Sequence, residues 1–219
     1  MILFLNMVYY DLHTHHLPTH SEDIVIINRM VGNGVWPISN LGTIYYSAGI
    51  HPWYINAKEK QLAEFEDLLL CSDVVAVGEV GLDKYAKVSL IEQRLIFERS
   101  ILLAEKKELP LIIHCVKAWN ELIDLKKVLK PRMPWIIHGF RGNEQLAKQL
   151  IQQGFFLSFG KYFNPKAVFE AWPNHLFVET DDQQIDIRVV YKNISSVLNL
   201  PLKLFVFQVA ENVHRVLQL

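Results

Sequence analysis

The chain has 219 residues, of which 51% are hydrophobic and 21% are charged, so it can bury a large core and is not a disordered chain. Its 22 basic and 23 acidic residues give a formal charge of −1. This balance argues against binding to nucleic acid or membranes through bulk charge alone, although metal ions could still attract phosphates. Two cysteines, Cys71 and Cys115, are too few for a disulfide framework and indicate a reducing compartment. We therefore expect a single globular domain over residues 1–219 and a cytoplasmic location.

The first ten residues are apolar, but they include no basic segment and no small-residue cleavage site. We expect them to belong to a buried strand rather than to a signal peptide. No other segment has the roughly 18 uninterrupted apolar residues that a membrane span needs. The sequence therefore predicts no membrane partner.

Short apolar runs rich in Val, Ile and Phe recur along the chain, and each ends near a polar residue. They lie at residues 7–10, 24–27, 43–50, 74–77, 111–113, 135–137, 155–157 and 176–178. Such runs are typical of strands that are buried on both faces.

Amphipathic patterns between and after the later runs predict helices. These patterns cover residues 89–107, 118–130, 144–153, 188–199 and 204–217. Regular alternation of strand and helix implies parallel strands joined by crossovers. About eight strands in one domain favour a TIM-type (β/α)8 barrel. A doubly wound open sheet is the alternative, but no Gly-rich phosphate loop follows the first strand to support it.

The early part of the chain lacks this alternation. Residues 15–24 and 28–43 are rich in Pro, Gly and Asn and predict no helix. We expect the first covering helices of the barrel to be reduced or missing, so that the wall beside the second strand is thin. Apolar residues such as Val31, Val35 and Trp36 would protect this wall, either as a folded-over loop or through self-association with a second copy.

Polar residues at the carboxyl ends of parallel barrel strands converge on one mouth. Here they include His13, His15, Glu79, His114, His138 and Asp181. One histidine at a strand end is more often structural, but this combination of imidazoles and carboxylates suits one or two divalent ions, Zn²⁺, Mn²⁺ or Mg²⁺. Paired metals promote hydrolytic displacement, and Asp181 or Glu79 could act as the catalytic group that deprotonates the attacking water.

Several motifs resemble, in order, those of the TatD-type metal-dependent hydrolases, a branch of the amidohydrolase superfamily. They are Asp-Leu-His-Thr-His at 11–15, Gly-Ile-His-Pro at 49–52, Gly-Glu-Val-Gly-Leu-Asp at 78–83, Ile-His at 113–114, Ile-His-Gly-Phe-Arg-Gly at 137–142 and Glu-Thr-Asp at 179–181. Ala-Glu-Asn-Val at 210–213 is similar to an element of the family's closing helix. The resemblance extends from residue 7 to about residue 217 and implies a TIM barrel with DNase activity.

Residue by residue, the resemblance implies that Glu79 is a bridging carboxylate. It makes metal ligands of the other strand-end residues, His13, His15, His114, His138 and Asp181. It also implies that His51 contacts the substrate. Glu79 stands where a carbamylated lysine would be needed in other amidohydrolases, which argues against that group. Separately, Phe140, like Trp119, Tyr162 and Phe163, follows a strand end and could bind substrate by stacking on bases. Packing in a lid over the mouth is an equally good explanation of these aromatic residues.

The chain also departs from the family pattern. The stretch from His15 to Gly49 is short, and Asp182-Gln183-Gln184 replaces the proline and basic loop that generally follow the aspartate at position 181. The sequence therefore predicts a metal-dependent phosphodiesterase, a deoxyribonuclease that acts on DNA ends or short single strands. The alternatives are a metal-dependent hydrolase of a small phosphoester or amide, and a reduced, non-catalytic paralogue that binds metal.

Overall fold

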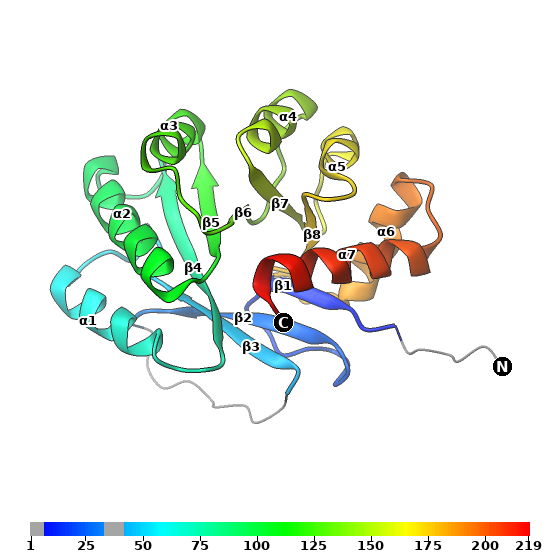
Figure 1. The fold of residues 1–219 in the computed structure, drawn as a ribbon, viewed down its shortest axis with the longest axis horizontal. Coiled ribbons are helices and arrows are strands. Elements are labelled where there is room, and N and C mark those ends of the chain that lie inside the picture. Colours follow the sequence, from blue (N-terminus) through cyan, green and yellow to red (C-terminus); the bar gives the residue numbers. More distant parts are fainter. Residues whose placement is uncertain (1–6, 33–41) are drawn as a thin grey trace.

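The computed structural model describes residues 7–32 and 42–219. Eight strands form one sheet in chain order, and each strand pairs in parallel with the next one (Figure 1). The strands are β1 Tyr10–Thr14, β2 Ile24–Met30, β3 Ile44–Gly49, β4 Val74–Asp83, β5 Leu111–Val116, β6 Trp135–Ile137, β7 Phe155–Phe159 and β8 Leu176–Val178. This order is that of the TIM-type barrel that the sequence predicts.

The sheet closes where β1 meets the end of β8. The main-chain N–H of Asp181 donates to the carbonyl of His13 at 2.9 Å, and the N–H of His15 donates to the carbonyl of Asp181 at 3.1 Å. Thr14 and Asp181 form a parallel bridge between the two segments. The first strand and the last strand therefore place their polar ends side by side.

Seven helices surround the barrel in the described residues. They are α1 Lys58–Leu68, α2 Leu90–Lys107, α3 Trp119–Leu129, α4 Glu144–Gln152, α5 Pro165–Ala171, α6 Ile187–Val197 and α7 Leu202–Leu217. The five predicted helices are confirmed to within two residues at each end. Side-chain caps explain two of the starts, because Ser89 accepts a hydrogen bond from the N–H of Glu92 and Asn143 accepts one from the N–H of Leu146.

Two helices and several strand boundaries differ from the sequence-based expectation, most clearly those of β1 and β4. Helix α1 is strongly polar and buries little beyond Phe65, while α5 has only seven residues, so neither shows a clear apolar stripe. The first strand was expected at residues 7–10 but lies at Tyr10–Thr14, and β4 continues through Glu79 to Asp83. Both strands run through polar residues because these line the inside of the mouth.

The first crossover has no covering helix: residues 15–23 between β1 and β2 form bends and turns. On the outer wall, the Arg29 guanidinium of β2 lies 3.9 Å from the centre of the Tyr46 ring of β3, where a helix would otherwise pack. Val31 is buried. Val35 and Trp36 lie outside the described residues, and self-association at this wall stays a prediction.

Among the described helices, none taken singly is long and apolar enough to cross a membrane. Only α6 and α7 taken together, with a bend of 109° between them, meet that test by length and composition.

Asn212 ties the last helix to the last strand. Its side chain is fully buried, and its amide donates to the carbonyls of Pro173 at 2.8 Å and Leu176 at 3.0 Å. These two carbonyl oxygens lie just before and at the start of β8. The asparagine of the closing helix therefore positions the strand that leads to Asp181.

We expect Asn212→Ala to lower the free energy of unfolding by about 2 kcal/mol, because it leaves buried carbonyl oxygens without a donor. Urea denaturation followed by circular dichroism would measure the loss. Glu211→Ala is the matched control, since Glu211 is exposed on the same helix and should change stability by less than about 0.5 kcal/mol. Equal effects of the two changes would contradict this role of Asn212.

Candidate metal centre

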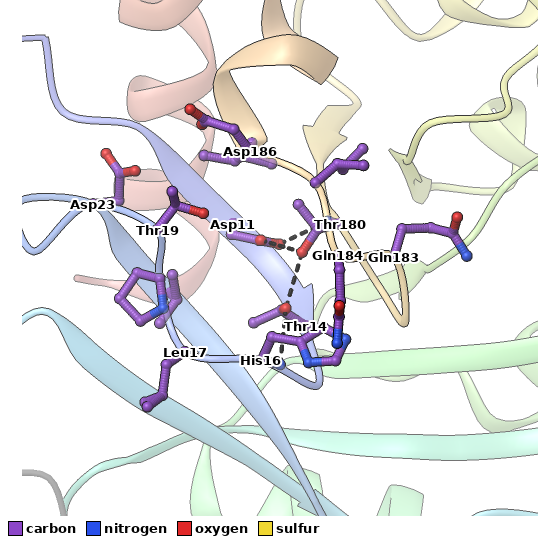
Figure 2. Close-up of a pocket in the computed structure, with 14 residues that line it drawn as sticks. Asp11, Thr14, His16, Leu17, Thr19, Asp23, Thr180, Gln183, Gln184 and Asp186 are labelled. Atoms are coloured by element: carbon purple, nitrogen blue, oxygen red, sulfur yellow. Dashed lines mark hydrogen bonds between the residues drawn. The ribbon is translucent and has the colours of Figure 1, made fainter.

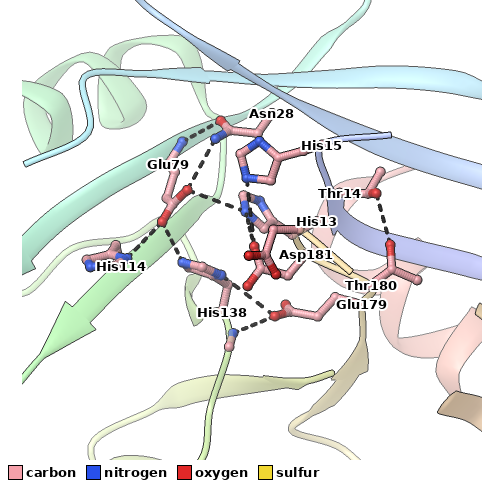
Figure 3. A network of polar contacts seen from close by, with 12 residues as sticks. His13, Thr14, His15, Asn28, Glu79, His114, His138, Glu179, Thr180 and Asp181 are labelled. Atoms are coloured by element: carbon pink, nitrogen blue, oxygen red, sulfur yellow. Dashed lines mark hydrogen bonds and ion pairs between the residues drawn. The ribbon is translucent and has the colours of Figure 1, made fainter. Parts of the chain in front are cut away.

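The barrel brings all six predicted ligands into one mouth (Figure 3). Imidazoles come from β1, β5 and the residue after β6, and carboxylates come from β4 and the segment after β8: His13, His15, Glu79, His114, His138 and Asp181. His13 is completely buried and Glu79 is 4% exposed. The rim residues are more open, since the side chains of His15 and Asp181 are 29% and 23% exposed.

The Glu79 carboxylate lies at the centre of the cluster. Its Oε1 is 2.8 Å from Nδ1 of His114 and 2.7 Å from Nε2 of His138. Nε2 of His51 is 3.2 Å from the same oxygen. The other oxygen, Oε2, accepts a hydrogen bond of 3.2 Å from the Asn28 amide. One carboxylate therefore faces residues from four neighbouring strands or strand ends.

Glycine around Glu79 allows β4 to approach β5 closely. Gly81 has φ of 145°, and a Cβ there would lie 2.0 Å from the main-chain oxygen of His114. At Gly78, a Cβ would lie 2.7 Å from the Cβ of Ile112. Any larger residue would push the two strands apart, so the glycines of the 78–83 motif hold Glu79 next to His114.

A second group of ligand atoms surrounds Asp181. Its Oδ1 lies 3.7 Å from Nε2 of His13 and 3.7 Å from Nε2 of His15. Asp181 has φ of 55°, a left-handed conformation that Asp and Asn adopt more readily than most residues. This turn aims the carboxylate back over the mouth toward the two histidines.

His13 provides the test of whether the site fits a metal. Within the described part of the chain, neither ring nitrogen has a hydrogen-bond partner, although both are buried. Its Nε2 is 3.5 Å from Glu79 and 3.7 Å from Asp181, too far for good hydrogen bonds. An unpartnered buried nitrogen is costly, and a cation between these groups would satisfy it. The residues therefore fit a divalent ion.

The possible ligand atoms form overlapping trios, in each of which the atoms lie within 4.8 Å of one another. The trios are His13–Glu79–His138, His13–His15–Asp181, His51–Glu79–His114 and His138–Glu179–Asp181. Because the His13–Glu79–His138 trio adjoins the His13–His15–Asp181 trio, the geometry suits one ion or two neighbouring ions. The mixed nitrogen and oxygen donors suit Zn²⁺ or Mn²⁺ well, while the identity of the metal stays a prediction.

The hydrogen bonds of His51 indicate which of its two ring nitrogens carries the proton. The N–H of Trp53 donates to Nδ1 of His51 at 3.2 Å, so the neutral ring carries its proton on Nε2. That proton faces Glu79 and makes Nε2 a donor rather than a metal ligand. The hydrogen bonding is in keeping with the expected substrate contact, which stays a prediction.

Phe140 has no open face for a substrate. It is 1% exposed, and its ring packs at 6.1 Å from the Trp119 ring and 5.9 Å from the Phe159 ring. Phe140 therefore braces the wall of the mouth, whereas the expected stacking on bases would need an exposed ring.

Three residues that hold the ligands escaped the sequence analysis. Asp83 accepts a hydrogen bond from Nε2 of His114 at 2.9 Å, leaving Nδ1 directed at Glu79. Glu179, fully buried, accepts a bond from the N–H of Gly139 at 2.6 Å, next to His138. Asp83 and Glu179 lie within the motifs at 78–83 and 179–181, so the sequence did contain a signal that could have identified both residues.

Asn28 is the third such residue and lies on β2. Its Oδ1 accepts the main-chain N–H of Glu79 at 2.9 Å, while its Nδ2 donates to the Glu79 carboxylate at 3.2 Å. The side chain is 2% exposed. Asn28 therefore fixes both the backbone and the carboxylate of the central residue.

Glu79 and His138 shift each other's pKa values in opposite directions. Burial opposes ionisation of Glu79, but the charge of His138 and hydrogen bonds from His114 and His138 hold the pKa of Glu79 well below its usual range. Burial also opposes a charge on His138, but the Glu79 and Glu179 carboxylates raise the pKa of His138 well above its usual range. The two neighbouring carboxylates therefore favour the protonated form of the His138 imidazole.

We expect metal binding to release protons and to weaken as the pH falls, because a protonated His138 cannot be a ligand. The affinity should therefore rise with pH as the His138 imidazole loses its proton. Titration calorimetry of Zn²⁺ or Mn²⁺ in buffers of different ionisation enthalpy would count the protons. The double change His13→Ala and His15→Ala should lower the metal content found by elemental analysis. Unchanged content would refute the site.

A separate expectation concerns Asn28. Replacing it with Ala should weaken metal binding about tenfold or more, which is typical for partners that orient a ligand. Competition with a chelating dye would measure the affinity. Asn120→Ala removes an exposed amide on α3 and serves as the control. If both variants bind metal like the wild type, Asn28 does not position Glu79 for binding.

Comparison with known proteins agrees with this geometry. The family profile described as TatD related DNase matches residues 33–218. An uncharacterized metal-dependent hydrolase from Bacillus subtilis, YabD, is 34% identical over 148 residues, which cover 63% of this chain and 58% of the relative. A protein from Cronobacter turicensis named 3'-5' ssDNA/RNA exonuclease TatD is 31% identical over 114 residues, covering 51% of this chain and 43% of that protein. The matched segments thus span about half the length of these relatives.

Solved structures show the same fold over nearly the whole chain. The Escherichia coli TatD homologue YJJV has a TM-score of 0.80 at 19% identity and covers 96% of this chain and 98% of that chain. A TatD family hydrolase from Entamoeba histolytica has a TM-score of 0.75 at 17% identity, with 95% and 97% covered. Together with the matched family profile, the barrel and its cluster of ligands show that the chain belongs to the TatD-related DNase family.

Proposed function

We propose that this protein is a metal-dependent phosphodiesterase that cleaves DNA at ends or in short single strands. The observation that carries the proposal is a pair of overlapping ligand groups that share His13: one adds Glu79 and His138, and the other adds His15 and the Asp181 carboxylate on the open rim. The Cronobacter relative named 3'-5' ssDNA/RNA exonuclease supports the choice of substrate class.

The residues around Glu79 and Asp181 would hold one or two divalent ions. When bound, such ions polarise a phosphate and lower the pKa of a coordinated water. The protein supplies the arrangement: Asn28 and Asp83 orient Glu79 and His114, and the β1–β8 seam holds Asp181 beside the first-strand histidines.

Asp181 would act as the general base. Its carboxylate would accept a proton from the attacking water, whose oxygen bonds to phosphorus as the bond to the leaving sugar oxygen breaks. That leaving oxygen would take a proton from solvent. The Nε2–H of His51 would donate a hydrogen bond to a non-bridging phosphate oxygen, where negative charge accumulates. In this arrangement the proton acceptor and the donor face the mouth from opposite parts of the barrel.

We expect Asp181→Asn to lower turnover of single-stranded DNA by roughly a hundredfold or more, because loss of a general base typically costs 10²–10⁴. Asn tolerates the left-handed backbone at this position, so the fold should persist. The assay compares labelled single-stranded DNA, duplex DNA, bis(p-nitrophenyl) phosphate and a small amide with Mg²⁺, Mn²⁺ or Zn²⁺. Single-stranded ends should be cleaved faster than duplex DNA.

Asp182→Asn is the control, since it removes the same charge from the neighbouring exposed side chain. It should retain turnover. Equal turnover by the Asp181 variant and the wild type would remove Asp181 from this role. Metal-dependent cleavage of only the small diester or the amide would replace the DNA proposal with a small-molecule hydrolase, and no cleavage of any substrate would favour the non-catalytic paralogue.

A further inference from the structure

A row of cationic and aromatic side chains leads away from the metal centre. We name it the basic track and define it by the residues Lys117, Trp119, Arg141, Lys161 and Tyr162, which follow β5, β6 and β7. A cavity of about 550 Å³ is lined by His114 and Asp181 of the centre and by the first three track residues. Arg141 also lines a second hollow, of about 850 Å³, together with Lys161 and Tyr162. The track is therefore continuous with the site.

Among the residues that the structure describes, the cations of the track have no acidic partners. In residues 7–32 and 42–219, ion pairs engage nearby cations such as Lys84, which lies 2.6 Å from Glu121, and Lys166, 3.9 Å from Glu144. No such pair involves the exposed side chains of Lys117, Arg141 or Lys161 within that part of the chain. Their charge is therefore available to an anionic ligand.

The aromatic residues of the track lie beside these cations. The Tyr162 ring is 52% exposed, with the Arg141 guanidinium 5.4 Å and the Lys161 ammonium 5.1 Å from its centre. Trp119 is half-buried and is braced from behind by Phe140. Alternating cations and exposed rings match a single strand, whose phosphates need charge and whose unpaired bases need a stacking surface.

The opposite side of the mouth has the reverse charge. There the loops at residues 16–23 and 182–187 enclose a cavity of about 400 Å³ (Figure 2). These loops contain no Lys or Arg, and their acidic residues are Glu22, Asp23, Asp182 and Asp186. The adjacent Arg188 is already engaged, since it contacts Glu22, Asp23 and Asp186. A polyanion is repelled on this side.

We propose that the basic track binds the single strand on one side of the scissile phosphate, with a base stacked on Tyr162 and a phosphate at Arg141. The acidic loops leave no favourable path on the other side, so the strand extends from the site in one direction only. This inference rests on the proposed function and adds the substrate-binding residues.

The first experiment measures binding without cleavage. Fluorescence anisotropy of a labelled oligo-dT of about eight nucleotides is followed in EDTA with the full-length chain. Arg141→Ala and Tyr162→Ala should each raise Kd about tenfold, while Tyr162→Phe should bind like the wild type because it keeps the ring. A plot of the logarithm of the association constant against the logarithm of the salt concentration has a negative slope. Its magnitude should decrease by about 0.7 for Arg141→Ala and return to the wild-type value for Arg141→Lys. Lys148→Ala, an exposed cation on α4 away from the track, is the control.

The second experiment compares substrates of different length with metal present. For Arg141→Ala and Tyr162→Ala, kcat/KM for the oligonucleotide should fall about tenfold more than kcat/KM for bis(p-nitrophenyl) phosphate, with the loss in KM. Lys148→Ala should leave this ratio unchanged.

The outcomes separate this inference from the proposed function. If the wild type cleaves DNA but the Arg141 and Tyr162 variants bind and cleave it normally, the track is refuted and the phosphodiesterase stands. If the wild type cleaves no phosphodiester but binds the oligonucleotide through the track, only the proposed reaction fails. If Arg141→Ala and Tyr162→Ala lose no more affinity than Lys148→Ala, the loss reflects the general surface charge and not the track. That result would overturn the inference.

Discussion

Burial of the Glu79 carboxylate is the constraint on which the rest of the site depends. An ionised carboxylate taken out of water costs several kcal/mol unless charges and hydrogen-bond donors surround it. Here those groups come from different strands: Asn28 on β2, His51 after β3, His114 on β5 and His138 after β6. The need to satisfy one charge therefore constrains the relative positions of five of the eight strands, β2 to β6, and the same arrangement creates a site for cations.

Hydrogen bonds between β1 and the segment that follows β8 hold Asp181 in position. Asp11 is buried, and its carboxyl oxygens accept hydrogen bonds from the N–H and the hydroxyl of Thr180 at 3.0 and 2.5 Å. Burial raises the pKa of Asp11 to about 8. Thr14 also contacts the Thr180 hydroxyl at 2.9 Å. These bonds join β1 to the segment after β8 (Figure 2), and the neighbouring residues His13 and Asp181 face the cluster of ligand atoms (Figure 3).

The strands and the main ligands were predictable because each depends on local sequence. Short apolar runs ending in His, Glu or Asp mark both a buried strand and its exposed end, and parallel order then brings these ends together. Asn28 was not predictable in this way, since its role depends on a partner 51 residues away. The helix at 58–68 was missed because most of its residues are polar. Phe140 was misjudged because its exposure depends on how Trp119 and Phe159 pack against it.

A formal charge of −1 is compatible with nucleic-acid binding when the charge is unevenly distributed around the mouth. The loops after β5, β6 and β7 carry cations that form no ion pair with any described residue, whereas the loops after β1 and β8 carry carboxylates. A single strand of nucleic acid would therefore be attracted by the local electrostatic field of these cations rather than by the net charge of the molecule. This field falls off within about 10 Å at moderate salt. The short connection at 15–23, which has no covering helix, contributes to this asymmetry because it brings two carboxylates, Glu22 and Asp23, and no Lys or Arg to this side. Arg188 offsets only part of their charge, since it also contacts Asp186. Under the proposed binding mode, the same connection would help to set the direction in which the nucleic-acid strand leaves the site.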